Sequence, residues 1–167
     1  MGSHFKPPAR EDDRPAGCWV AVLETQRLVG TEKDYTIYLS AAERERHAAL
    51  RNSKRRLEWL AGRLAAKHLF LQRLEVRVPN GGPCWRPALL QLSAQSLDSF
   101  PAWMYQSIEV PAGTDPQDPA PRFRWCGRAK EDAVSLSHTG NDACACLSEG
   151  STVGVDIERH AHASLPV

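Results

Sequence analysis

The chain has 167 residues, of which 42% are hydrophobic and 25% are charged, and its formal net charge is +1. A chain of this length builds one domain with a hydrophobic core and is too short for two. The near-neutral charge gives no global indication of nucleic acid or membrane as a partner. No apolar run approaches the roughly 18 residues of a transmembrane helix, and the first residues lack the apolar stretch of a signal peptide.

The cysteines argue against two kinds of stabilised scaffold. Their number is odd and no pair has the Cys-x-x-Cys spacing, which disfavours a disulfide framework and a structural zinc site. The five are Cys18, Cys84, Cys126, Cys144 and Cys146. Free thiols are typical of a reducing compartment, so we expect a cytoplasmic protein.

Three segments differ in composition from the rest of the chain. Residues 1–17 are rich in proline and acidic side chains and are predicted to be a disordered lead-in, while 159–167 form a tail. Residues 79–122 begin and end in proline-rich sequence and are predicted to be an irregular insertion. Within it, 89–92 and 103–110 have the composition of short strands.

Two helices are predicted in the first half of the chain. Ser40 and Glu43 have the spacing of a capping box, which predicts a helix that continues to about Arg51. A longer helix is predicted over residues 53–74, because its leucines recur at helical spacing on one face. The charged residues of this helix, Arg63 and Lys67 among them, are expected to project away from that face.

The last third of the chain alternates as strands do. Residues 134–138 and 143–147 are predicted to be a pair of strands joined by a turn, and residues 153–158 a third strand. An N-terminal strand of residues 18–23 completes the pattern. We therefore predict one domain over residues 18–158, of the α+β class: a small antiparallel sheet with a long helix packed on one face.

Asp156 and Glu158 are the sharpest candidate site. Side chains two apart on a strand leave from the same face, so these carboxylates are expected to lie close together and to attract a cation. Hard oxygen ligands without a neighbouring thiolate favour Mg²⁺, which takes one or two carboxylates and completes its shell with water and phosphate. The same string is also compatible with ordinary solvent-facing acids on an edge strand.

Basic residues are concentrated in the helical region. Between residues 43 and 77 there are ten Lys or Arg and four Glu, a composition that suits phosphate recognition or a solvated helix surface. The helical array consists of Arg46, Lys54, Arg55, Arg56, Arg63 and Lys67. Glutamates interrupt this array, and no helix-turn-helix or zinc-finger pattern is present, so nucleic acid is not the expected partner.

Two further motifs contain residue types that bind anions. His138 follows Ser137 at the end of a predicted strand, where an imidazole and turn N–H groups can reach a ligand. A histidine in such a position is also commonly a turn or surface residue. Arg128 follows Gly127 between basic and aromatic residues, a weaker indication of nucleotide binding.

The order of these motifs resembles a known family. They are Leu39-Ser-x-x-Glu43 with Arg46, Trp59-Leu-Ala-Gly-Arg63-Leu-Ala-Ala-Lys67, Gly127-Arg128, Ser135-Leu-Ser-His138 and Gly154-Val-Asp-Ile-Glu158. Together, over about residues 18–158, they resemble the N-terminal half of the two-half 4′-phosphopantetheinyl transferases. The resemblance implies one half of that fold.

The resemblance implies transfer of the phosphopantetheine arm of coenzyme A to a serine of an acyl- or peptidyl-carrier protein, with Mg²⁺. Such carriers serve fatty-acid, polyketide and nonribosomal peptide biosynthesis. By position, Asp156 and Glu158 look like the metal ligands. The residues expected to bind coenzyme A are Arg46, Arg63, Arg128, Ser137 and His138.

Two departures from the family pattern affect this expectation. Ala129 stands where the family usually has proline, which leaves the Arg128 loop less fixed. The chain also lacks the family's Trp-x-x-Lys-Glu-Ala-x-x-Lys helix, whose glutamate is the third metal ligand. The catalytic centre is therefore expected to be incomplete: either the chain is a fragment or a truncated gene product, or a second chain or self-association completes the site. The alternative is a non-catalytic coenzyme A-binding or scaffold remnant of the fold.

Overall fold

The computed structural model describes four stretches of the chain: residues 18–75, 88–110, 122–148 and 153–158. The predicted lead-in and tail lie outside the described residues.

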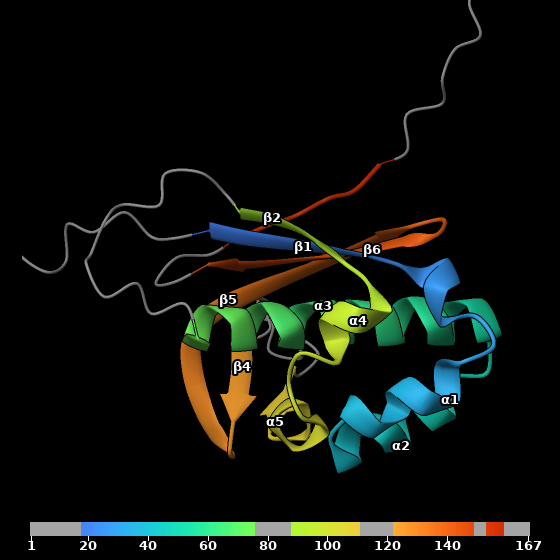
Figure 1. Ribbon diagram of the computed structural model, residues 1–167, viewed down its shortest axis with the longest axis horizontal. Helices are drawn as coiled ribbons and strands as arrows, with labels where there is room; N and C mark the ends of the chain where they lie inside the picture. Colours follow the sequence, from blue (N-terminus) through green and yellow to red (C-terminus); the bar gives the residue numbers. More distant parts are fainter. Residues whose placement is uncertain (1–17, 76–87, 111–121, 149–152, 159–167) are drawn as a thin grey trace, which may run out of the picture.

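The elements form a sheet, a central helix beneath it, and a set of shorter helices on the far side of that helix (Figure 1). Their order is β1 (Cys18–Glu24), η2 (Thr25–Leu28), α1 (Glu32–Tyr35), η3 (Thr36–Tyr38), α2 (Ala41–Ala49), α3 (Ser53–Glu75), β2 (Ala88–Leu92), α4 (Ala94–Leu97), α5 (Ala102–Gln106), β3 (Ile108–Glu109), β4 (Arg122–Trp125), β5 (Arg128–Thr139) and β6 (Asp142–Ser148). The α+β class is confirmed.

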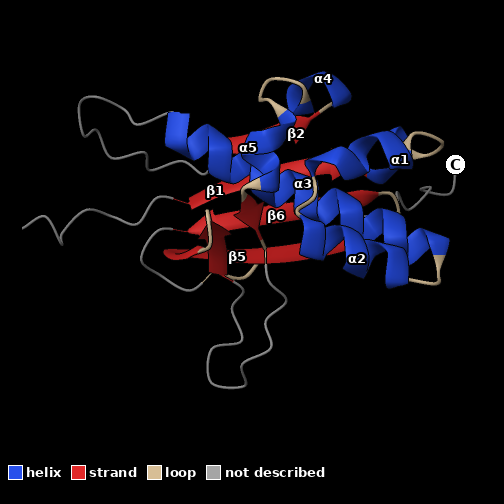
Figure 2. Ribbon diagram, turned by 90° about the horizontal axis from the view of Figure 1, so that it is seen from below, coloured by secondary structure: helices blue, strands red, loops and turns tan. Residues whose placement is uncertain are grey.

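The six described strands form one sheet in the order β2-β1-β6-β5-β4-β3. Neighbouring strands are antiparallel, except that β2 runs parallel to β1. The sheet is therefore mixed, because the chain leaves β1, crosses the face of the sheet through α3 and returns beside β1 in the same direction. Figure 2 shows α3 in front of the strands, as predicted for the long helix.

Helix α3 is the centre of the fold, and its predicted extent is confirmed. Every residue from 60 to 71 is buried, because the sheet covers one side of the helix and α2, η3 and α5 cover the other. Arg63 and Lys67, which were expected to project outward, are 6% and 0% exposed. No helix in the described stretches is long and apolar enough to cross a membrane.

The predicted hairpin is formed by β5 and β6, which pair Ser137 with Cys144 and His138 with Ala143. The prediction of a third strand over residues 153–158 was wrong, because this segment is not a strand and is not part of the sheet. Its backbone N–H groups donate to serine hydroxyls of β5 instead of to backbone carbonyls, so no strand ladder forms.

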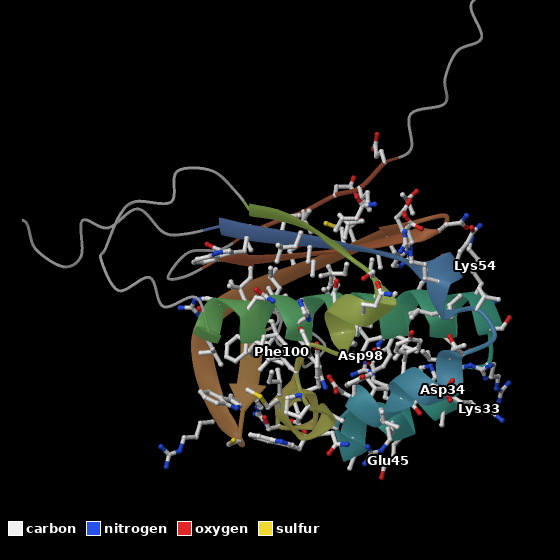
Figure 3. All side chains as sticks on the ribbon, viewed as in Figure 1. Lys33, Asp34, Glu45, Lys54, Asp98 and Phe100 are labelled. Carbon is white, nitrogen blue, oxygen red and sulfur yellow. The ribbon has the colours of Figure 1, made fainter. Side chains whose placement is uncertain are left out.

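The predicted insertion is more regular than expected in its described part, residues 88–110. The 89–92 segment is a strand as predicted, but 103–110 is mostly helix α5 followed by the two-residue strand β3. Its apolar side chains enter the core, which is the reason that this part folds back onto the domain. Figure 3 places Asp98 and Phe100 beneath α3, on the side away from the sheet.

A buried ion pair joins the helical layers. Ser40 and Glu43 form the predicted capping box, with the Glu43 N–H donating to Ser40 Oγ at 3.3 Å and Ser40 N–H to Glu43 Oε2 at 3.0 Å. Glu43 Oε2 also pairs with Lys67 Nζ. The ammonium group of Lys67 donates further to the carbonyl oxygens of Tyr38 at 3.1 Å and Tyr105 at 3.0 Å. Its three donors are thus matched by three acceptors.

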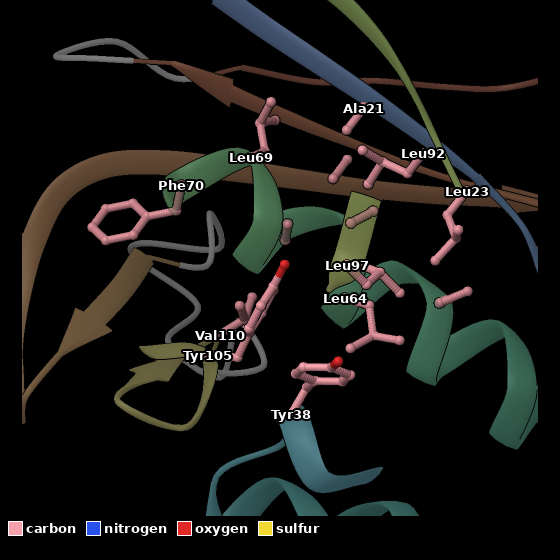
Figure 4. Close-up of a cluster of buried hydrophobic side chains, with 14 of the residues drawn as sticks. Ala21, Leu23, Tyr38, Leu64, Leu69, Phe70, Leu92, Leu97, Tyr105 and Val110 are labelled. Carbon is pink, nitrogen blue, oxygen red and sulfur yellow. The ribbon is translucent and has the colours of Figure 1, made fainter. Parts of the chain in front are cut away.

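The aromatic side chains around this pair are packed in the core. Tyr38 and Tyr105 meet edge to face, with ring centroids 4.8 Å apart, and Figure 4 shows both rings beside Leu64 of α3. Tyr38 Oη donates to Asp98 at 2.8 Å. Segments 60 residues apart in the sequence are therefore joined beneath α3.

Replacing Lys67 with Met should destabilise the fold strongly. The substitution leaves the Glu43 carboxylate buried without its cation, which costs about 3–5 kcal/mol. Denaturant unfolding measures the loss, and Lys54→Met, at an exposed position of the same helix, should change stability by less than about 0.5 kcal/mol. Equal losses for the two variants would contradict the role of the buried pair. Combining Lys67→Met with Glu43→Gln should recover part of the stability.

His68 is a second buried titratable group beside this cluster. Its Nδ1 lies 2.7 Å from Tyr105 Oη, and its ring packs edge to face on Phe100. Burial lowers the pKa of His68 from 6.5 to about 4. The folded state therefore holds a neutral imidazole.

The free energy of unfolding should fall in acid because of His68. The unfolded chain takes up a proton near pH 6.5 and the folded chain only near pH 4, so stability is present above 6.5 and lost as pH falls through about 4. The loss amounts to up to about 3 kcal/mol. The free energy of unfolding, measured by denaturant unfolding at several pH values between 4 and 7, should change less with pH in His68→Gln than in the wild type. The same slope in both proteins would rule out this origin.

Candidate functional site

Arg63 and Arg46 form a cationic site between α2 and α3. The guanidinium of Arg63 stacks on the ring of Trp59 at 4.8 Å. Its Nε is buried and has no hydrogen-bond partner among the described residues. Burial lowers the pKa of Arg63 to about 10, while the nearby Glu43 raises it and Arg46 lowers it further. Arg46 lies exposed on α2 beside it.

A buried guanidinium without a hydrogen-bonded anion is unfavourable, because it has lost water and gained no partner of equal strength. The donors of Arg63 and the exposed charge of Arg46 would suit an anionic group such as a phosphate. The structure therefore brings together two of the predicted coenzyme-binding residues.

Ser137 and His138 are separated by the alternation of the strand. Ser137 lies on the sheet face away from α3, and its Oγ donates to Asp156 Oδ1 at 2.9 Å. His138 lies on the α3 face, where its Nδ1 is 3.6 Å from Glu58 Oε2. Adjacent side chains on a strand point to opposite faces, so the two residues do not form one pair in space.

Glu58 lies beside His138, and the sequence did not predict this contact. It is 9% exposed, and besides His138 it contacts Lys54 Nζ at 3.7 Å. The contact with Lys54 can be predicted from the sequence, because the two residues are four apart on one helix. The contact with His138 depends on how α3 lies on β5, which no local pattern records.

Asp156 and Glu158 leave the 153–158 segment on the same side. Exposure alternates along this segment: both acids are exposed, while Val155 and Ile157 are partly buried. Two carboxylates can supply part of the oxygen ligands that Mg²⁺ requires. The described residues contain no group of three or more acidic, histidine or cysteine side chains arranged to hold a metal.

Arg128 and the Ser137–His138 pair lie at opposite ends of β5. Arg128 is exposed at the β4–β5 hairpin, whose turn has Cys126 and Gly127 at φ of 50° and 75°. His138 lies at the opposite end of β5, ten residues away, or about 30 Å along an extended strand. The structure does not bring Arg128 to Ser137 or His138, and its predicted role in the same site has no geometric support.

A separate cavity of about 230 Å³ lies beside α1 and α2. It is lined by Glu32, Lys33, Thr36, His47, Ala48 and Arg56. Glu32 Oε1 is 3.0 Å from His47 Nε2 and 2.9 Å from Arg56 Nε. Burial lowers the pKa of His47, which the Glu32 carboxylate partly opposes. Because Glu32 already neutralises Arg56, this cavity is less suited to an anion than the Arg46–Arg63 site.

No family model matches the sequence, and neither does any curated protein. Solved structures do resemble the fold. The apo-ACPS of Chronobacterium ammoniagenes has a TM-score of 0.53 and 23% identity, covering 80% of this chain and 96% of that one. The ACPS–CoA complex from the same organism has a TM-score of 0.52 and 22% identity, covering 81% and 98%.

A third structure is the holo-(acyl-carrier-protein) synthase of Bacillus anthracis in complex with CoA (3′,5′-ADP). It has a TM-score of 0.49 and 22% identity, covering 79% of this chain and 93% of that one. The expected half-domain thus corresponds to nearly the whole length of the two Chronobacterium chains. At these identities the likeness establishes the fold: the chain has the fold of the holo-acyl-carrier-protein synthases, which is the phosphopantetheinyl transferase fold.

Proposed function

We propose that this protein binds coenzyme A with Mg²⁺ and transfers the 4′-phosphopantetheine arm to a serine of an acyl- or peptidyl-carrier protein. The fold supports this reaction class, and one of the similar structures is a complex with CoA. The order of the sequence motifs along the chain is a second line of support, because it depends on the sequence alone.

The observation that carries the proposal is the buried guanidinium of Arg63. Its Nε, which has no partner in the described part of the chain, and its exposed neighbour Arg46 suit a group with several anionic oxygens. The phosphates of coenzyme A are such groups. Trp59, which stacks on the guanidinium, limits its movement and so favours a fixed orientation of the donors.

Asp156 and Glu158 would hold the magnesium ion. When bound, Mg²⁺ would neutralise the diphosphate and stabilise the leaving group. The protein's own part is to position the coenzyme and the serine of the carrier protein. Asp156 lies on the sheet face opposite α3, whereas Arg63 lies on α3 near Glu43 and Arg46 of α2. We therefore propose that a second copy or a second polypeptide joins acids of one chain to arginines of another.

The alternative proposal is a non-catalytic coenzyme A-binding or scaffold protein. One observation favours it, namely that the described residues contain no complete group of three metal-binding side chains. Both proposals allow a coenzyme site, and only the first requires transfer. Binding and transfer therefore have to be measured separately.

Arg63→Gln should weaken coenzyme A binding, as measured by isothermal titration calorimetry. Charged hydrogen bonds contribute about 1.5–3 kcal/mol, so the affinity should fall roughly 10- to 100-fold. Arg63→Lys should restore only part of it, because an ammonium group lacks the planar fork of donors.

Arg55→Gln is the matched control, since Arg55 is an exposed arginine of the same helix. It should leave the affinity within about twofold. The assignment would be contradicted if Arg63→Gln kept the melting temperature of the wild type and also bound coenzyme A with the same affinity.

Transfer itself is tested with the full chain, an apo carrier protein, coenzyme A and Mg²⁺. Mass spectrometry should show a gain of one phosphopantetheine unit on a serine of the carrier. The rate per chain should rise with chain concentration, because a second copy completes the site, and it should fall in Asp156→Asn. Coenzyme A binding with no mass gain under any of these conditions would support the scaffold alternative.

A further inference from the structure

The segment 153–158 is attached to the sheet by side chains. The N–H of Val155 donates to Ser135 Oγ at 3.0 Å, and the N–H of Ile157 donates to Ser137 Oγ at 3.3 Å. The two serines are two residues apart on β5 and so share a face. The two N–H groups have the same spacing. The serine hydroxyls thus take the place of a neighbouring strand's carbonyl groups and fix the register of the segment.

Ser137 has a second contact, with the carboxylate between these two amides. Its hydroxyl donates to Asp156 Oδ1 at 2.9 Å while accepting from Ile157. The Ile157 N–H also lies 3.0 Å from the same carboxylate oxygen. Oδ1 is therefore held by two donors, whereas Oδ2 has no hydrogen bond within the described stretches and belongs to an exposed side chain. The orientation of the carboxylate is fixed with one oxygen left for a ligand.

We propose that Ser135 and Ser137 are positioning residues for Asp156. Ser135 fixes the backbone before the carboxylate, and Ser137 fixes both the backbone after it and the carboxylate itself. Groups that hold a metal ligand in one orientation commonly change metal affinity 10- to 100-fold. This inference rests on the proposed function for its metal, and it gives Ser137 a role different from direct contact with the nucleotide, because its hydroxyl proton is engaged by Asp156.

Two measurements on the full chain test the proposal. Amide hydrogen exchange, followed by NMR, reports whether the segment is held: Ser135→Ala should speed exchange at Val155, and Ser137→Ala should speed it at Ile157. Electron paramagnetic resonance with Mn²⁺ alone reports the affinity of the carboxylates. Ser137→Ala should weaken Mn²⁺ binding about tenfold, Ser135→Ala should weaken it less, and Ser137→Thr, which keeps the hydroxyl, should restore it.

Ser99→Ala is the control, because the Ser99 hydroxyl is exposed and donates only locally, to the carbonyl of Ser96 at 2.7 Å. It should leave both measurements unchanged. Unaltered exchange at Ile157 and unaltered Mn²⁺ affinity in Ser137→Ala would overturn the proposal. A wild-type chain that binds no Mn²⁺ would instead overturn the metal part of the proposed function. The exchange rates would then still decide whether the serines hold the segment.

Discussion

The buried pair of Glu43 and Lys67 is the interaction on which the helical side of the molecule depends. An ammonium group in the interior is tolerated only when its charge and all its donors are satisfied. Here the acceptors come from three separate elements: the first turn of α2, the carbonyl of Tyr38 in η3 and the carbonyl of Tyr105 in α5. Glu43 also accepts the N–H of Val110 at 3.2 Å. One ion pair thereby specifies how the insertion and the N-terminal helices pack on α3. Apolar contacts alone would specify this packing less precisely.

The same arrangement explains why Arg63 differs from Lys67. Both lie on the buried part of α3, one turn apart, and Glu43 is near both. The Glu43 carboxylate pairs with Lys67 and accepts the N–H groups of Ser40 and Val110. Arg63 is left with the ring of Trp59, and its Nε has no partner among the described residues. One cation of this helical face is therefore neutralised inside the fold, while the guanidinium of Arg63 keeps a donor without a partner in the described part of the chain. The same face of α3 thus carries the structural cation Lys67 and the cation Arg63 that the proposed function assigns to coenzyme A.

The sequence predicted the elements whose causes are local. The capping box at Ser40, the extent of α3 and the β5–β6 hairpin depend on side-chain types at short spacings, and all three are present. It failed where the partner is distant. The burial of Lys67 depends on carbonyl groups 29 and 38 residues away. The 153–158 segment has the alternation of a strand, but its N–H groups bond to serines, a choice that alternation cannot distinguish from strand pairing. The candidate residues were therefore found more readily than their arrangement.

That arrangement bears on how the site would operate. In Ser135-Leu136-Ser137-His138 the strand period sends the serines to the face that carries Asp156, and Leu136 and His138 to the face of α3. A short sequence motif is thus divided between two surfaces of the sheet. His138 and the arginines stand on the α3 side, and the carboxylates on the other. The sheet lies between the acids and the arginines. A ligand that contacts both groups therefore has to pass around the end of β5 or to bridge two chains. The second route is the one that the proposed function takes, since it joins the acids of one chain to the arginines of another.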